Sequence, residues 1–147
     1  MLMDFQQAMA DLAASPENCR ALRADTGWLE RRYTLGARER RQLLALVHDA
    51  GMAHACMIYR VNRLAPLAQN FDATLQALDD DMRGLLPAYW AEHPHAIAHE
   101  AIEAARFGRW LGERLPEHAP AREPLAREAA RVQEALSLSL LATEALA

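Results

Sequence analysis

The stretch 34–51, TLGARERRQLLALVHDAG, carries the clearest helical pattern in the chain. Its apolar residues recur at the spacing of one helix face, and Gly51 stands where a helix stop is expected. The buried stripe of this helix is predicted to comprise Leu43, Leu44, Leu46 and Val47.

Three arginines, Arg38, Arg40 and Arg41, open the same helix. The N-terminus of a helix carries a partial positive charge, so cations are unfavourable there. A paired acidic side chain, or exposure to solvent, must therefore compensate for these three positive charges. Because arginine is a dominant residue type in protein interfaces, this cluster is a candidate contact surface.

Composition extends the helical prediction to the whole chain. Ala and Leu dominate the apolar residues, whereas Val and Ile are scarce, and no strand pattern of useful length occurs. The predicted fold class is all-α, a compact bundle of about seven to nine short helices. The expected helices are 4–14, 16–25, 26–33, 34–51, 52–64, one restarting at Pro66, one after the aspartates 79–81, a long one over 93–115, and a last one from about Pro124.

Some individual positions in these helices can also be predicted. Ser15 is the expected cap of the helix that starts at Pro16. Trp28, Ile102 and Trp110 are expected to pack in the core, whereas Trp90, just before the His93-Pro94 break, is expected near the surface.

A chain of 147 residues predicts one helical domain spanning 1–147. Its charge divides it into a basic part, 1–64, with nine Arg against seven acids, and an acidic part, 65–147, with seven Arg against thirteen acids. The net charge of −4 does not favour nucleic acid as a partner. The basic part suits an acidic peptide or a protein partner, but the simpler explanation of these charges is solvated helix faces.

Two cysteines, Cys19 and Cys56, stand outside any CxxC motif and are expected to be buried thiols. No apolar stretch reaches 18 residues, so no membrane contact is expected. The sequence also shows no signal-peptide pattern, which makes the cytoplasm the expected location.

Residues 57–67, MIYRVNRLAPL, place strong hydrogen-bonding groups in an otherwise apolar helix. Arg60 and Arg63 are i, i+3 neighbours that could clamp a carboxylate. The alternative is that they anchor the helix to acids such as those at 79–81. At least one of Arg60 and Asn62 is predicted to be largely buried. The candidate binding residues are Arg38, Arg40, Arg41, Tyr59, Arg60, Asn62, Arg63 and Trp90.

His95, His99 and Glu103 would share one face of the predicted helix over 93–115. Two helical turns, about 12 Å, separate the first from the last, which is too far for one ion. No metal site and no cofactor are therefore expected in this chain. No serine or cysteine sits in a nucleophile motif, so no catalytic residue is expected either.

Two stretches resemble known families. LAASPENCRALRADTGWLERRYTLGARERRQLLAL and GMAHACMIYRVNRL, within 8–64, resemble the small α subunit of protocatechuate-type extradiol dioxygenases. That module is helical and packs on a separate catalytic subunit.

Residues 59–136 resemble the methanobactin-type and thiaglutamate-type partner proteins. The stretches YRVNRLAPLAQNFDATLQAL, LLPAYWAEHP, FGRWLGERLP and PLAREAARVQEAL carry this resemblance. Those proteins accompany TIM-barrel, multinuclear-iron oxygenases that modify cysteines in ribosomally made peptides. The positions that match the family are Tyr59, Arg60, Asn62, Tyr89, Trp90, His93, Pro94, Leu125, Ala126 and Glu128.

The resemblance implies a non-catalytic accessory subunit that docks on a larger catalytic subunit, a TIM-barrel iron oxygenase, and helps present a precursor peptide for cysteine modification. Iron is then expected in the partner. Three alternatives stay open: a small helical subunit of an extradiol-type dioxygenase, a stand-alone helical bundle that binds a small molecule, and an enzyme that uses His95, His99 and Glu103 with a metal.

Overall fold

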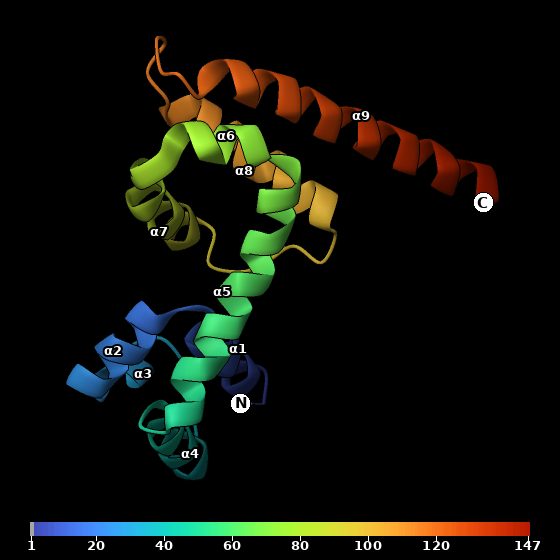
Figure 1. The fold of residues 1–147 in the computed structure, drawn as a ribbon. Helices are drawn as coiled ribbons and strands as arrows, with labels where there is room; N and C mark the ends of the chain where they lie inside the picture. Colours follow the sequence, from blue (N-terminus) through green and yellow to red (C-terminus); the bar gives the residue numbers. More distant parts are fainter. Residues whose placement is uncertain (1) are drawn as a thin grey trace. The chain divides into compact units, whose positions relative to one another are not determined.

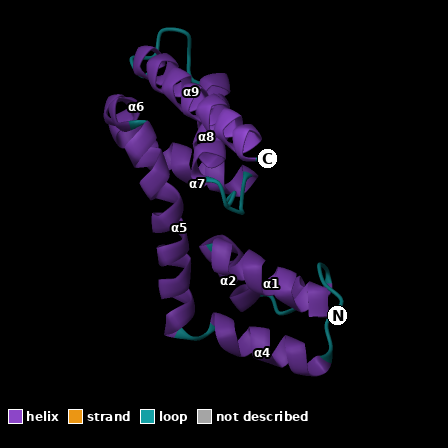
Figure 2. Ribbon diagram, turned by 90° about the vertical axis from the view of Figure 1, so that its right-hand side faces the viewer, coloured by secondary structure: helices purple, strands orange, loops and turns teal. Residues whose placement is uncertain are grey.

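The computed structural model describes residues 2–147, and every regular element in this range is helical (Figures 1 and 2). The predicted all-α class is therefore confirmed. None of these helices is both long and apolar enough to cross a membrane. The elements are α1 (Leu2–Ala14), α2 (Pro16–Ala24), α3 (Gly27–Glu30), α4 (Ala37–Val47), α5 (Ala50–Asn70), α6 (Asp72–Leu78), the 3₁₀ turn η1 (Asp79–Asp81), α7 (Met82–Glu92), α8 (Glu100–Arg114) and α9 (Arg122–Leu146).

The chain forms two compact units, Met1–Asn62 and Arg63–Ala147, and the boundary falls within α5. Each unit has its own cluster of buried apolar side chains. The predicted change from basic to acidic composition, at 64/65, lies two residues from this boundary. The expectation of one domain over 1–147 stays a prediction.

The first unit packs α1 to α4 and the start of α5 around one core. Ser15 caps α2 as predicted, since its Oγ accepts a hydrogen bond from the Asn18 N–H at 3.1 Å, and Pro16 occupies the first turn. Trp28 is buried and Arg32 lies over its ring, 4.4 Å from the centroid. The buried core residues are Ala8, Leu12, Cys19, Leu22, Trp28, Leu29, Leu43, Val47, Met52 and Cys56.

The second unit is built around four aromatic rings. Tyr89 meets Phe107 and Trp110 edge-on, with centroids 5.1 and 5.3 Å apart, and Phe71 meets Phe107 at 5.6 Å. The predicted burial of Trp110 is confirmed. Gly108 lets α8 approach the ring of Phe71, because a Cβ at this position would lie 2.9 Å from Phe71 Cζ.

α5 does not stop at Pro66, which corrects the predicted break there. The helix continues to Asn70, whose side-chain Nδ2 donates to the Pro66 carbonyl at 2.7 Å. Pro66 itself is buried, so packing outweighs the lost backbone hydrogen bond of a helix-interior proline. The chain turns at Phe71 instead, where a buried ring begins α6.

The predicted long helix over 93–115 is also corrected. α8 begins only at Glu100, and the segment 93–99 connects it to α7 as a loop (Figure 2). On α8, Glu103 is buried, whereas Ile102, predicted to be buried, is exposed. Pro94 disfavours the helical conformation for the residue before it, which agrees with an extended entry.

Glu128 of α9 holds the start of α6. Its carboxylate accepts hydrogen bonds from the Thr74 N–H at 2.7 Å, the Thr74 hydroxyl at 2.6 Å and the Ala73 N–H at 3.2 Å. These backbone N–H groups have no partner within their own helix, and the helix dipole favours an anion there. A side chain 54 residues away in the sequence thus supplies the cap of α6.

Candidate functional site

A buried carboxylate, Glu103, organises the polar groups of the second unit. Its Oε1 accepts a hydrogen bond from Arg63 Nε at 2.8 Å, and its Oε2 pairs with Arg106. Glu103 and Arg106 are i, i+3 neighbours on α8, so they share a helix face. Two guanidinium groups around one carboxylate offset the desolvation of a charge that is almost fully buried.

Arg106 extends this network toward α7 and the 93–99 loop. Its Nε donates to the Tyr89 hydroxyl at 3.0 Å, and its Nη2 donates to the His95 carbonyl at 3.1 Å. Burial raises the pKa of Tyr89 above its ordinary value, although the hydrogen bond from Arg106 opposes the shift. Tyr89 therefore stays a neutral phenol that accepts from Arg106.

A cavity of about 250 Å³ opens beside Arg106, at the end of α7 and along α8. Glu92 is fixed in its wall, because its carboxylate accepts a hydrogen bond from Trp110 Nε1 at 2.9 Å and pairs with Arg114. Arg114 also lies over the Trp110 ring, 4.1 Å from the centroid. The lining residues are Glu92, His93, Arg106, Arg109, Trp110, Glu113 and Arg114.

The charges around this cavity follow from their neighbours. The Trp110 N–H and the Arg114 guanidinium hold the pKa of Glu92 below its ordinary value. Burial and the nearby Arg106 lower the pKa of His93, so the imidazole is neutral near pH 7. Near pH 7 the wall therefore places a neutral His93 imidazole beside the ion pair of Glu92 and Arg114.

The predicted arginine cluster lies at the start of α4 and is exposed. Arg40 pairs with Glu30, whereas Arg38 and Arg41 form no ion pair with any residue of 2–147. Arg40 and Arg41 also line a hollow of about 290 Å³. The remaining residues around this hollow are Thr26, Glu30 and Leu44.

Arg60 and Arg63 serve separate carboxylates instead of clamping one. Arg60 pairs with Glu17 through two contacts, at 2.6 and 3.3 Å, inside the first unit. Arg63 belongs to the second unit and pairs with Glu103. The anchoring interpretation therefore fits both arginines, but the acids are not those at 79–81.

The remaining predicted residues are spread over α5 and α7. The Arg60 side chain is only 19% exposed, so the prediction that at least one of Arg60 and Asn62 is largely buried is confirmed. Asn62 is exposed and Tyr59 is half-buried. The deeply buried cation is Arg63. Trp90, expected near the surface, is half-buried and packs against the core of the second unit.

The predicted helical face of His95, His99 and Glu103 does not form. His95 and His99 lie in the 93–99 loop before α8. The Glu103 carboxylate forms ion pairs with Arg63 and Arg106. Among residues 2–147, no three His, Cys, Asp or Glu side chains gather closely enough to hold a metal ion.

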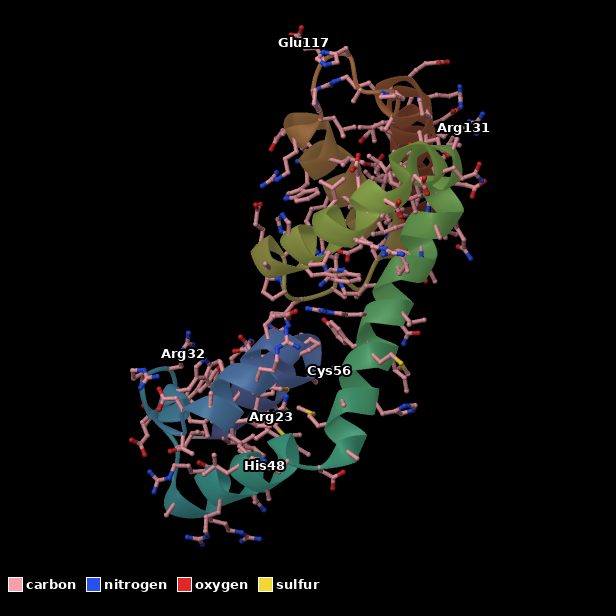
Figure 3. All side chains as sticks on the ribbon, turned by 60° about the vertical axis from the view of Figure 1, so that its left-hand side comes forward. Arg23, Arg32, His48, Cys56, Glu117 and Arg131 are labelled. Atoms are coloured by element: carbon pink, nitrogen blue, oxygen red, sulfur yellow. The ribbon has the colours of Figure 1, made fainter. Side chains whose placement is uncertain are left out.

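The two cysteines face each other in the first unit. Cys56 points from α5 toward α1 and α2 (Figure 3), and its Sγ lies 4.0 Å from Cys19 Sγ. Both thiols also approach the Leu12 carbonyl, at 3.2 and 3.3 Å. They are buried free thiols, as predicted, and burial raises the pKa of Cys19 to about 12.

Sequence reasoning missed the partners of Glu103 and the cavity beside them. The one available signal was the i, i+3 spacing of Glu103 and Arg106 on an amphipathic helix. That signal is weak by itself, because the helix predicted over 93–115 also includes the 93–99 loop.

No protein-family model, curated protein or solved structure matches the chain significantly.

Proposed function

We propose that this chain is a non-catalytic accessory subunit that docks on a larger, metal-dependent oxygenase and helps present a ribosomally made peptide for cysteine modification. The observation that carries the docking role is the apolar, unpartnered second half of α9. The oxygenase, its iron and the peptide come from the sequence resemblance alone.

The first half of α9 is anchored and the second half is not. Leu125, Glu128 and Val132 are the buried residues of this helix. Figure 1 shows its first half beside α6 and α8 and its second half extending past them. The exposed fractions there are 61% for Leu138, 65% for Leu140, 61% for Leu141 and 90% for Leu146.

The composition of this segment suits burial in an interface. From Ala135 to Ala147 the only charged side chain is Glu144. Leucines point to more than one side of the helix, since Leu140 and Leu141 are adjacent and about 100° apart. A helix that is apolar on several sides is normally buried, so a partner surface is the natural environment for this segment.

The exposed leucines of α9 are too few to hold a tight complex by themselves. Burying a leucine contributes roughly 1.5–3 kcal/mol, whereas association costs roughly 4–15 kcal/mol in lost freedom. Four leucines therefore give a weak complex, and a tight one needs additional surface.

The first unit offers a second apolar surface on α5. Met57, Ile58 and Val61 are about half exposed, and their i, i+1, i+4 spacing places them on one face. Three apolar side chains side by side on a helix surface form a patch that a partner can cover.

The arginines of α4 supply the electrostatic part of the proposed interface. Arg38 and Arg41 are exposed and carry no internal ion pair within 2–147, so an acidic patch on the partner can pair with them. Such pairs accelerate association and are screened by salt. The complex is therefore expected to weaken as ionic strength rises.

The test is co-expression with a TIM-barrel iron oxygenase of the kind that the resemblance implies, followed by size-exclusion chromatography. The double variant Leu138→Gln/Leu141→Gln is expected to separate from the enzyme. The matched control, Ala126→Gln/Ala130→Gln, places the same residue on exposed sites of the anchored half. A monomer at low salt, together with an enzyme that is fully active alone, would refute the proposal.

A further inference from the structure

We propose that the cavity beside α8 in the second unit binds a small zwitterion of the amino-acid type. This inference is independent of the docking proposal, because it rests on a different part of the chain and concerns a small molecule. It is carried by the charges that remain in the cavity wall after the internal ion pairs are accounted for.

Most charged side chains in the wall already have a partner within the protein. Arg106 pairs with Glu103, and Arg114 pairs with Glu92. Arg109 and Glu113 form no ion pair or hydrogen bond with any residue of 2–147, although both line the cavity. One cation and one anion are thus left for a ligand, which is the charge pattern that a zwitterion complements.

Helix geometry keeps these two residues apart but on the same side. They are i, i+4 neighbours, separated by about 6 Å along the axis of α8. Their order, Arg before Glu, is the less favourable one for an i, i+4 ion pair, in agreement with the unpaired state. An amino acid carries its carboxylate and its ammonium on one carbon, so Arg109 can bind the carboxylate while Glu113 binds the ammonium.

The rest of the wall is held in place before any ligand arrives. Arg106 is fixed by Glu103, Tyr89 and the His95 carbonyl, and Glu92 is fixed by Trp110 and Arg114. A wall whose charged groups already have partners loses little freedom on binding. Only the side chains of Arg109 and Glu113, both exposed, need to be ordered by the ligand.

The size of the cavity limits the ligand. Its volume of about 250 Å³ lies below the roughly 300–1,000 Å³ of sites for drug-sized molecules. A single amino acid suits this space better than a nucleotide or a folded peptide.

The experiment measures binding of the common L-amino acids to the full chain, first by thermal shift at millimolar concentration and then by calorimetry. Each of Arg109→Met and Glu113→Gln is expected to weaken the best amino acid about ten- to one-hundredfold, because each removes a hydrogen bond to a charged group. Arg127→Met, an exposed arginine of α9, is the control and should bind like the unaltered protein.

Two ligand derivatives assign each charge to its residue. The C-terminal amide of the amino acid lacks the carboxylate. The Arg109→Met variant should therefore bind the amide and the parent amino acid with the same affinity. The N-acetyl derivative lacks the ammonium. The Glu113→Gln variant should therefore bind this derivative and the parent amino acid with the same affinity. The proposal is overturned if no amino acid binds, if either variant binds as well as the unaltered protein, or if both derivatives bind as well as the parent.

Discussion

Arg63 and Glu103 lie forty residues apart in the sequence and form an ion pair at 2.8 Å, with side chains only 2% and 3% exposed. The pair links the part of α5 in the second unit to α8. Arg63 Nη2 is buried without a hydrogen-bond partner among residues 2–147, and the guanidinium lies 5.6 Å from the centroid of the Tyr89 ring. A charge placed this deeply contributes stability only while its partner is present.

Removal of Glu103 is expected to be the more damaging change in this network. Glu103→Gln leaves both Arg63 and Arg106 without their carboxylate and should lower the free energy of unfolding by about 3–5 kcal/mol. Arg63→Met should cost less, because Glu103 keeps Arg106. Urea denaturation measures both. Glu123→Gln, in the exposed pair with Arg127, is the control and should stay within about 0.5 kcal/mol. A reversed order of the two buried variants would contradict the argument.

Replacement of Arg60 is expected to cost little stability, although this residue lies in an otherwise apolar stretch of helix. Its partner Glu17 is half exposed, so Arg60→Ala should lower the free energy of unfolding by about 1 kcal/mol or less, instead of several. Partial burial raises the pKa of Glu17, but the hydrogen bonds from Arg60 and the backbone outweigh this and lower it overall. The contribution of the pair is therefore present at neutral pH and is lost as the pH falls through the lowered pKa. A loss of several kcal/mol in the variant would show that this pair is more strongly shielded from water.

Glu128 is expected to be far more sensitive to substitution than the exposed glutamates of α9. Glu128→Ala removes three hydrogen bonds from the start of α6 and leaves two backbone N–H groups unsatisfied, at a cost of about 2–4 kcal/mol. Glu134→Ala, an exposed glutamate on the same helix, is the matched control and should be near neutral. Thermal unfolding followed by circular dichroism compares the two. Equal melting temperatures would mean that water replaces the cap.

Two glycines in helices are expected to respond oppositely to alanine. Gly84 is exposed and a Cβ there meets nothing within 4 Å, so Gly84→Ala should stabilise the protein by about 0.5–1 kcal/mol. Gly108→Ala gains the same propensity, but its Cβ would collide with Phe71 in the core. Overpacking of this kind costs about 1–3 kcal/mol, so the net effect should be destabilising. Chemical denaturation of both variants gives the comparison, and a stabilised Gly108→Ala would show that the Phe71 ring moves freely.

The paired thiols predict a loss of stability in alkali. Burial raises the pKa of Cys19 to about 12, whereas an unfolded cysteine ionises near 8.5. The contribution of the neutral thiol is complete below the unfolded pKa and declines as the pH rises from there toward 12. Reaction with a thiol reagent at pH 7 should be slow and should accelerate on adding urea. Cys19→Ala should reduce the loss between about pH 8.5 and 10, below the range in which tyrosines ionise. An unchanged profile in this range would assign the loss to other groups.

The sequence by itself determined the helical class, most helix positions, the capping of α2 by Ser15, and the burial of Trp28, Trp110 and both cysteines. These features depend on local propensity and on apolar spacing, which neighbouring residues encode directly. Tertiary structure decided where long-range partners meet. Packing around Pro66 allows α5 to continue past this proline. The cap of α6 comes from Glu128, which lies on α9. The polar site around Glu103 also depends on long-range contacts, because Arg63, Tyr89 and Glu103 come from three different helices. No local sequence pattern encodes which buried charge pairs with which partner.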